Sequence, residues 1–262
     1  MLMSKRNFYV LGCSHASGSE LEGDGVGHNT DFNLNNSFAA LLGKKMGYNV
    51  INLAFPGGSN DSIFRTCHRL LDSTEGEDPL SWQRSTVPLK PSPWIPQPKF
   101  DQDQDIIFVS WTGEERLEVF DTNNSEWMNY SVGASLTASK FNRHHRDFYN
   151  SYIRFWCSAD ETGYNNKLKN VLALDAYAKY RGAVVIHHDS FALFKFMIKN
   201  DLLWLNPSST FVNWAEENDY DHSSEWYHYC LDAHKDYANK LYGELIAAKR
   251  PEFKELKFED AK

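Results

Sequence analysis

The stretch Phe8-Tyr9-Val10-Leu11-Gly12-Cys13-Ser14-His15, close to the start of the chain, decides the fold. Four apolar residues run into a glycine and then into small and polar residues, which is typical of a buried strand that ends in a tight turn. A hydroxyl that directly follows such a strand is exposed at the edge of the sheet. Ser14 is therefore the first candidate functional residue. The alternative is that it only caps a short helix.

Further apolar runs and amphipathic segments alternate along the rest of the chain. We expect strands at residues 49–54, 105–111 and 183–187. Helices are expected at residues 37–46, after Asn60 or Asp61, at 166–180, and from Asp232 or Ala233 to about residue 249. Alternating units of this kind build a mainly parallel sheet that is covered by helices on both faces. The pattern therefore predicts a three-layer α/β/α fold.

The length of 262 residues favours a single α/β domain that spans residues 1–262 and carries insertions at about 73–103, 121–165 and 201–230. The first insertion is rich in proline, which argues against a helix or an inner strand there. The second is polar and aromatic, with one helix expected near residues 145–156. The third is aromatic and is expected to be irregular.

Composition excludes several classes of partner. Lys and Arg number 27 against 35 Asp and Glu, a net charge of −8, which argues against binding to nucleic acid or to an anionic membrane surface. No apolar run approaches the ~20 residues of a membrane span, and the first residues do not form a signal peptide. The four cysteines lie far apart, as free thiols of a reducing compartment would. We therefore expect a cytoplasmic protein; its oligomeric state stays open.

A second candidate segment, Asn52-Leu53-Ala54-Phe55-Pro56-Gly57-Gly58-Ser59-Asn60, follows the second expected strand. Glycines let a backbone approach a ligand closely, and free N–H groups at a helix start suit an anion or a developing oxyanion. The alternative is a plain turn in which Asn60 caps the next helix.

The third segment is Asp232-Ala233-His234, at the start of the last expected helix. A carboxylate near a histidine can fix its tautomer. The alternative is that Asp232 caps the helix and His234 lies on the surface. Taken together, the three segments supply a nucleophile, backbone donors and a base at the carboxyl edge of one sheet. That is the set of groups needed for acyl transfer.

These blocks, in this order, resemble those of the SGNH (GDSL-type) hydrolases. Gly12-Cys13-Ser14 corresponds to the family's Gly-Asp-Ser, with Cys13 in place of the aspartate. Asn52 and Gly57 match its second block, and Asp232 and His234 match its last. The resemblance implies an SGNH/flavodoxin-like fold with Ser14 as nucleophile and His234 as base. It also implies that the N–H groups of Ser14 and Gly57 contribute to an oxyanion hole.

The sequence departs from the family pattern in two informative places. The family's Gly-x-Asn-Asp block is absent after the third strand, so Thr112 or Asn60 would have to replace its oxyanion asparagine. Asp232 and His234 are separated by one residue where two is commoner. Asp232 is expected to orient the histidine, and the alternative is that Asp232 caps the helix while Asp189, Asp221 or Glu225 orients the histidine.

Downstream of the third strand, Trp111-Thr112 is followed by Arg116-Leu117-Glu118. This string is similar to divergent SGNH members encoded by tailed bacteriophages, which implies association with a virion if the gene is of phage origin. Arg116 and Glu118 are interpreted as an ion pair, with substrate contacts as the alternative. Four tryptophans are interpreted as loop packing, with a sugar-stacking platform as the alternative: Trp111, Trp204, Trp214 and Trp226.

The leading hypothesis is a serine esterase that hydrolyses a small or carbohydrate O-acyl ester with no metal and no organic cofactor. The alternative is a catalytically silent SGNH-like protein with a binding or virion-associated structural role, favoured by the missing asparagine block. A metal-dependent hydrolase built on His15, His187 and His188 ranks third. Adjacent residues of a strand point to opposite faces, so His187 and His188 do not easily share one ion.

Overall fold

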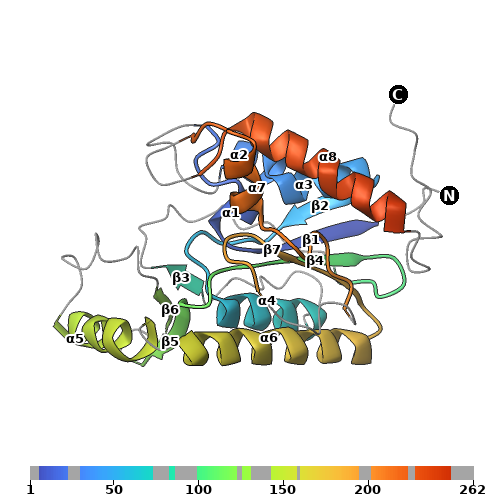
Figure 1. The fold of residues 1–262 in the computed structure, drawn as a ribbon. Helices are drawn as coiled ribbons and strands as arrows, with labels where there is room; N and C mark the ends of the chain where they lie inside the picture. Colours follow the sequence, from blue (N-terminus) through green and yellow to red (C-terminus); the bar gives the residue numbers. More distant parts are fainter. Residues whose placement is uncertain are drawn as a thin grey trace.

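The chain is described by a computed structural model over residues 6–22, 30–72, 83–85, 99–122, 126–130, 143–157, 160–194, 202–223 and 228–248. Its centre is a sheet of four parallel strands in the order β2-β1-β4-β7 (Figure 1). The strands are β1 (Asn7–Gly12), β2 (Asn49–Asn52), β4 (Ile106–Trp111) and β7 (Val184–Asp189). All four strands predicted from the sequence are present.

Helices cover both faces of this sheet (Figure 1). One face carries α1 (Ser14–Ser17), α2 (Asp31–Asn36), α3 (Phe38–Lys45), α7 (Phe211–Glu217) and α8 (Leu231–Ala248), and the other carries α4 (Asn60–Asp72) and α6 (Asp160–Tyr180). The α/β class with a mainly parallel sheet is thereby confirmed. No helix of the described residues is long and apolar enough to cross a lipid bilayer.

Strand β1 shows why both faces must be covered. Phe8 and Val10 belong to the core beneath α3 and α8, whereas Tyr9 and Leu11 belong to the core beneath α4 and α6. All four side chains are buried. A strand that is apolar on both sides, as in a parallel sheet, positions the turn that follows it from two directions.

A second, smaller sheet lies beside the carboxyl ends of the main strands (Figure 1). It has the order β3-β6-β5, built from β3 (Gln83–Ser85), β5 (Leu117–Asp121) and β6 (Glu126–Tyr130). The Asn129 side chain accepts a hydrogen bond of 2.9 Å from the backbone N–H of Ser59, which fastens the small sheet to the turn after β2. The sequence did not predict this sheet. Most of the proline-rich stretch lies outside the described residues.

The helix predicted near residues 145–156 exists as α5 (Arg143–Tyr152), continued by the π-helical segment η3 (Ile153–Cys157). Helix α7 corrects the expectation that residues 201–230 are irregular. The Thr210 side chain accepts the N–H of Asn213 at 3.0 Å and so caps α7. Phe211 and Ala215 are four residues apart, so they lie on the same face of α7, and both are buried in the core.

Candidate active site

Ser14 begins α1, directly after β1, at the carboxyl edge of the central sheet. A Cβ on Gly12 would lie 2.7 Å from Cβ of Ala16 and 2.9 Å from the backbone oxygen of Ser110. Only glycine permits α1 to start so close to the end of the strand. The Ser14 side chain is 7% exposed, and its hydroxyl forms no hydrogen bond with any other described residue. It is therefore available to a ligand at this edge.

Asn52, the first residue of the second block, holds α1 in place through hydrogen bonds. Its Nδ2 donates to the backbone oxygens of Ala16 at 3.0 Å and Leu34 at 2.9 Å, and to the Ser37 hydroxyl at 3.1 Å. Its Oδ1 accepts the N–H of Ala54 at 3.0 Å. Every polar atom of this side chain is thus used to tie α1, α2 and α3 to the end of β2.

The turn after β2 offers one backbone donor. Gly57 has φ of +77°, which favours glycine, and the N–H of Gly58 donates to Phe55 O at 2.9 Å. The N–H of Gly57 forms no hydrogen bond with the part of the chain that the structure describes. Gly57 thus keeps the backbone group that the resemblance assigns to an oxyanion hole.

Of the two side chains predicted to replace the missing asparagine, that of Asn60 is not a free donor. Oδ1 of Asn60 accepts the N–H of Thr112 at 3.0 Å, while its Nδ2 donates to the oxygens of Thr112 at 3.4 Å and Gly113 at 3.1 Å. Asn60 therefore fastens the turn after β2 to the segment after β4, which corrects its interpretation as an oxyanion donor. The Thr112 hydroxyl is fully buried and has no partner among the described residues.

His234 does not have the environment expected of the base. Its Nδ1 accepts the N–H of Phe38 at 2.9 Å, so the neutral ring carries its proton on Nε2. The ring packs on those of Phe38 and Phe211, with centroids 5.8 Å and 4.6 Å away. Burial lowers the pKa of His234 to about 3. A proton on Nδ1 would break the hydrogen bond from Phe38 and place a charge in an aromatic core. The structure therefore argues against the expected role of His234 as the base.

Asp232 does not orient His234. Its side chain is 75% exposed and pairs with Lys235, with the Lys Nζ 3.0 Å from Oδ1. Among the alternatives, Asp189 is buried and holds the Lys167 ammonium at 3.0 Å. Glu225 lies outside the described residues. The expected pairing of Asp232 with His234 is therefore corrected, because the one group faces solvent and the other accepts a backbone amide.

A second histidine, His228, lies six residues before His234 and has a carboxylate partner. Nδ1 of His228 lies 2.6 Å from Oε2 of Glu20, and both side chains are largely buried. With Nδ1–H donating to the carboxylate, Nε2 of His228 is left as a proton acceptor. The His228 ring also lies edge-on to that of His15, at 5.1 Å between centroids, and His15 is the residue after Ser14. The carboxylate–histidine pair thus lies at the Ser14 edge.

The backbone at Glu20 is held in an uncommon conformation. Its φ is +66°, in the left-handed region that non-glycine residues rarely adopt. Such strain persists where surrounding structure demands it and is frequent at functional sites. This pair was not predicted from the sequence. His228 itself is separated by two residues from Glu225, in Glu225-Trp226-Tyr227-His228, which is the commoner separation between carboxylate and histidine in the SGNH pattern. That spacing was the signal that could have identified His228.

The structure also contradicts the predicted Arg116–Glu118 ion pair and separates the histidines of the third hypothesis. Glu118 pairs with Arg65, whose Nε and Nη2 lie 3.0 and 2.7 Å from its carboxylate oxygens, so it is not the partner of Arg116. His188 bonds Tyr237 on the α8 side, at 2.7 Å. His187 accepts from Trp111 on the α6 side, at 3.1 Å. The described residues contain no group of three or more ligands suited to a metal ion.

The tryptophans are mostly packing residues. Trp111 and Trp204 are buried and pack beside His187, with ring centroids 6.0 and 5.4 Å away. Trp214 packs on Tyr220 and Tyr237. Trp226 lies outside the described residues. The interpretation as loop packing holds for the first three.

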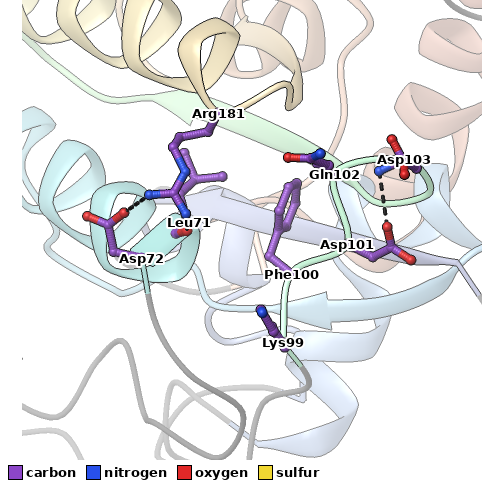
Figure 2. A pocket seen from close by; sticks show the side chains of 8 residues that line it. All are labelled: Leu71, Asp72, Lys99, Phe100, Asp101, Gln102, Asp103 and Arg181. Atoms are coloured by element: carbon purple, nitrogen blue, oxygen red, sulfur yellow. Dashed lines mark hydrogen bonds and ion pairs between the residues drawn. The ribbon is translucent and has the colours of Figure 1, made fainter.

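A hollow of about 690 Å³ lies elsewhere, at the amino ends of β4 and β7 (Figure 2). Arg181 is paired there with Asp72, and the Asp101 carboxylate accepts the backbone N–H of Asp103 at 3.1 Å. It is lined by Leu71, Asp72, Lys99, Phe100, Asp101, Gln102, Asp103 and Arg181. None of the nucleophile, base or backbone donors described above reaches this edge.

No family model matches the chain, and no curated protein matches it. Among solved structures, it is similar to a protein assigned to the G-D-S-L lipolytic family from Desulfitobacterium hafniense DCB-2, with 13% identity over 92% of this chain and 98% of that one, at a TM-score of 0.45. It is also similar to an acetyl xylan esterase from the rumen bacterium Butyrivibrio proteoclasticus, with 13% identity over 95% of this chain and 65% of that one, at a TM-score of 0.45.

A third similar structure is a family two carbohydrate esterase from Clostridium thermocellum in complex with cellohexaose. The identity is 13% over 93% of this chain and 64% of that one, at a TM-score of 0.35. This chain therefore spans about two thirds of the length of the two carbohydrate esterases. At such identities and TM-scores, the similarities decide nothing about the chemistry of the site, which rests on this chain's own residues.

Proposed function

We propose that this protein is a serine-dependent ester hydrolase in which Ser14 is the nucleophile, His228 the base and Glu20 the residue that positions the base. The observation that carries the proposal is the 2.6 Å contact between Glu20 and His228, whose ring lies 5.1 Å from that of His15, the residue after Ser14. A nucleophile, a base and a group that orients the base are the parts that acyl transfer needs.

In the proposed reaction, Ser14 Oγ attacks the carbonyl carbon of the ester while Nε2 of His228 takes the hydroxyl proton. The tetrahedral intermediate then collapses, the bond to the alkoxy oxygen breaks, and His228 returns the proton to the departing alcohol. Water, deprotonated by His228 in turn, attacks the acyl-serine and releases the carboxylic acid. Glu20 holds Nδ1–H throughout and stabilises the imidazolium that forms in each half.

The negative oxygen of the intermediate would be held by the N–H groups of Ser14 and Gly57. The side chain of Asn60 is committed to backbone groups, so it adds no third donor. The loss of one oxyanion donor costs on the order of 100- to 1000-fold in rate. We therefore expect a slow esterase. We further propose a small or carbohydrate O-acyl ester as the substrate.

The shortage of oxyanion donors also supports the second candidate function, a protein that binds a ligand at this edge without catalysis. The two functions differ in what Ser14 does. An esterase depends on its hydroxyl, whereas a binding protein tolerates Ser14→Ala with its ligand affinity largely kept.

The test is hydrolysis of p-nitrophenyl acetate by the wild type and by Ser14→Ala, His228→Gln and His234→Asn, each checked for folding by circular dichroism. We expect the first two variants to lose hydrolysis above background. His234→Asn keeps an acceptor for the Phe38 N–H and should stay active. Full activity in Ser14→Ala, or loss in His234→Asn with retention in His228→Gln, would overturn the assignment.

A further inference from the structure

Arg116 lies at the same edge of the sheet and has no role in the reaction proposed above. It follows β4, and its Nη1 donates to the backbone oxygen of Gly58, in the turn after β2, at 3.1 Å. The guanidinium carbon lies 5.9 Å from the ring centroid of Phe191, which follows β7. Its charge also helps to lower the pKa of His15, although burial is the larger cause. Arg116 therefore points into the region shared by the ends of three strands.

One buried donor of this guanidinium is unused among the described residues. Nε of Arg116 is buried and has no hydrogen-bond partner among the described residues. Glu115 forms a partly exposed ion pair with Arg116, but its carboxylate oxygen lies 3.7 Å from Nε, too far to fill that donor with a hydrogen bond. At Arg65, by contrast, the fork of Nε and Nη2 is filled by the carboxylate of Glu118. Taking a guanidinium out of water without filling its donors is costly, so the arrangement favours an anionic ligand.

We propose that Arg116 binds a carboxylate of the substrate, so that the ester hydrolysed at Ser14 is itself an anion. This inference rests on the proposed hydrolase function. A planar guanidinium fork matches a carboxylate in a bidentate pair. One guanidinium balances the single charge of a carboxylate better than the charge of a phosphate. The Phe191 ring beside it gives an apolar surface for the rest of the acid.

Arg116 would have a different signature if it only stabilised the oxyanion or the loop. In either case its loss would affect charged and neutral esters to the same degree. A carboxylate-binding residue instead changes the preference between an anionic ester and its neutral counterpart. The preference is therefore the quantity to measure.

A suitable matched pair is 4-acetoxybenzoate and methyl 4-acetoxybenzoate, which share the acetyl group and differ in one negative charge. Binding is measured by calorimetry in the Ser14→Ala background, which cannot hydrolyse either ester. We expect Ser14→Ala to bind the anion more tightly than the methyl ester. Adding Arg116→Gln should weaken binding of the anion by about 10- to 100-fold. Adding Arg181→Gln, which removes an equal charge at the far edge, should leave it unchanged.

The same pair is then used as substrates for the Ser14-containing protein. The ratio of kcat/KM for the anion to that for the methyl ester should fall by about 10- to 100-fold in Arg116→Gln and by less in Arg116→Lys, which keeps the charge without the fork. Absence of an anion preference in Ser14→Ala, or its survival after Arg116→Gln, overturns the inference. Tight inorganic phosphate binding in place of the benzoate overturns the carboxylate assignment. Failure of the wild type to hydrolyse either ester defeats the hydrolase proposal alone, because the calorimetry still reports on Arg116.

Discussion

Two histidines six residues apart have opposite chemistry because of the single atom that faces each Nδ1. His234 meets a backbone N–H from Phe38, which requires a bare nitrogen there and puts the proton on Nε2. His228 meets a carboxylate oxygen of Glu20, which requires a proton on Nδ1 and leaves Nε2 bare. Only the second tautomer can accept a proton from a serine through Nε2. Residue type alone does not distinguish the two.

Glu20→Gln tests the positioning role at the scale of one residue. Glutamine keeps the size of the side chain but removes the charge that stabilises the imidazolium. We expect kcat for p-nitrophenyl acetate to fall on the order of 10²- to 10⁴-fold, with little change in KM, because the carboxylate acts through His228 and does not touch substrate. Glu22→Gln, an exposed neighbour, is the control. A fall in kcat no larger than that of the control would contradict the role.

Acid should destabilise the fold through His234. In the unfolded chain the ring titrates near its ordinary pKa of 6.5, whereas burial lowers its pKa in the folded protein to about 3. Between these values the unfolded state binds more protons, so stability falls as pH is lowered through this window, by about 1.4 kcal/mol per pH unit for this proton. The pKa values of His15 and His187 are lowered by burial as well, and these residues add in the same direction.

His234→Asn removes one group that binds a proton on unfolding. The slope of unfolding free energy against pH, between about pH 6 and pH 4, should therefore decrease by the contribution of one proton. Urea unfolding at a series of pH values measures the slope. An unchanged slope in His234→Asn would mean that the ring titrates equally in the folded and unfolded chains.

At the scale of elements, the contact of α1 with the main sheet determines where the nucleophile lies. A Cβ on Gly12 would press on Ala16 and on the backbone of β4. Gly243, in α8, has open space around its Cβ position. The two glycines therefore give a matched pair for the substitution to alanine.

Gly12→Ala should destabilise the protein by about 1–3 kcal/mol, because overpacking against backbone cannot be relieved by a rotamer change. It should also reduce esterase activity by moving α1. Gly243→Ala should stabilise the protein by about 0.5–1 kcal/mol with activity unchanged, since alanine is the better helix former. Thermal and urea unfolding check both. Equal effects of the two substitutions would show that α1 does not pack as described.

The central sheet could be predicted from the sequence because its signal is local. Each main strand is a short apolar run, and the expected strand at 105–111 differs from β4 by one residue. The pairing of Glu20 with His228 joins residues 208 positions apart, and no local pattern records it. The small sheet was missed for the same reason, since β3 joins β6 across more than forty residues. Helix α7 was missed because it is only seven residues long, and its first four residues, Phe, Val, Asn and Trp, have modest helix propensity.

At the scale of the whole molecule, a buried ion pair joins one helical layer to the edge that bears the site. Nζ of Lys167, in α6, lies 3.0 Å from the Asp189 carboxylate at the end of β7, and neither side chain is exposed. Asp189 also accepts the N–H of Phe194 at 3.1 Å, and Lys167 donates to Ala192 O at 3.2 Å. The pair therefore anchors the segment after β7, which carries Phe191.

Lys167→Met should cost about 3–5 kcal/mol in unfolding free energy, because it leaves the Asp189 charge buried without a partner. The double variant Lys167→Met/Asp189→Asn should recover part of that loss, since no buried charge remains. Urea unfolding of the three proteins measures the difference. A double variant less stable than Lys167→Met would contradict this account of the pair.

The central claim is that Ser14 is a nucleophile served by His228, and the most direct measurement is labelling by a fluorophosphonate probe with the adduct located by mass spectrometry. The account predicts an adduct on Ser14 in the wild type and in His234→Asn, none in Ser14→Ala, and strongly slowed labelling in His228→Gln. Folded wild-type protein that is not labelled, or labelling at the wild-type rate in His228→Gln, would contradict it.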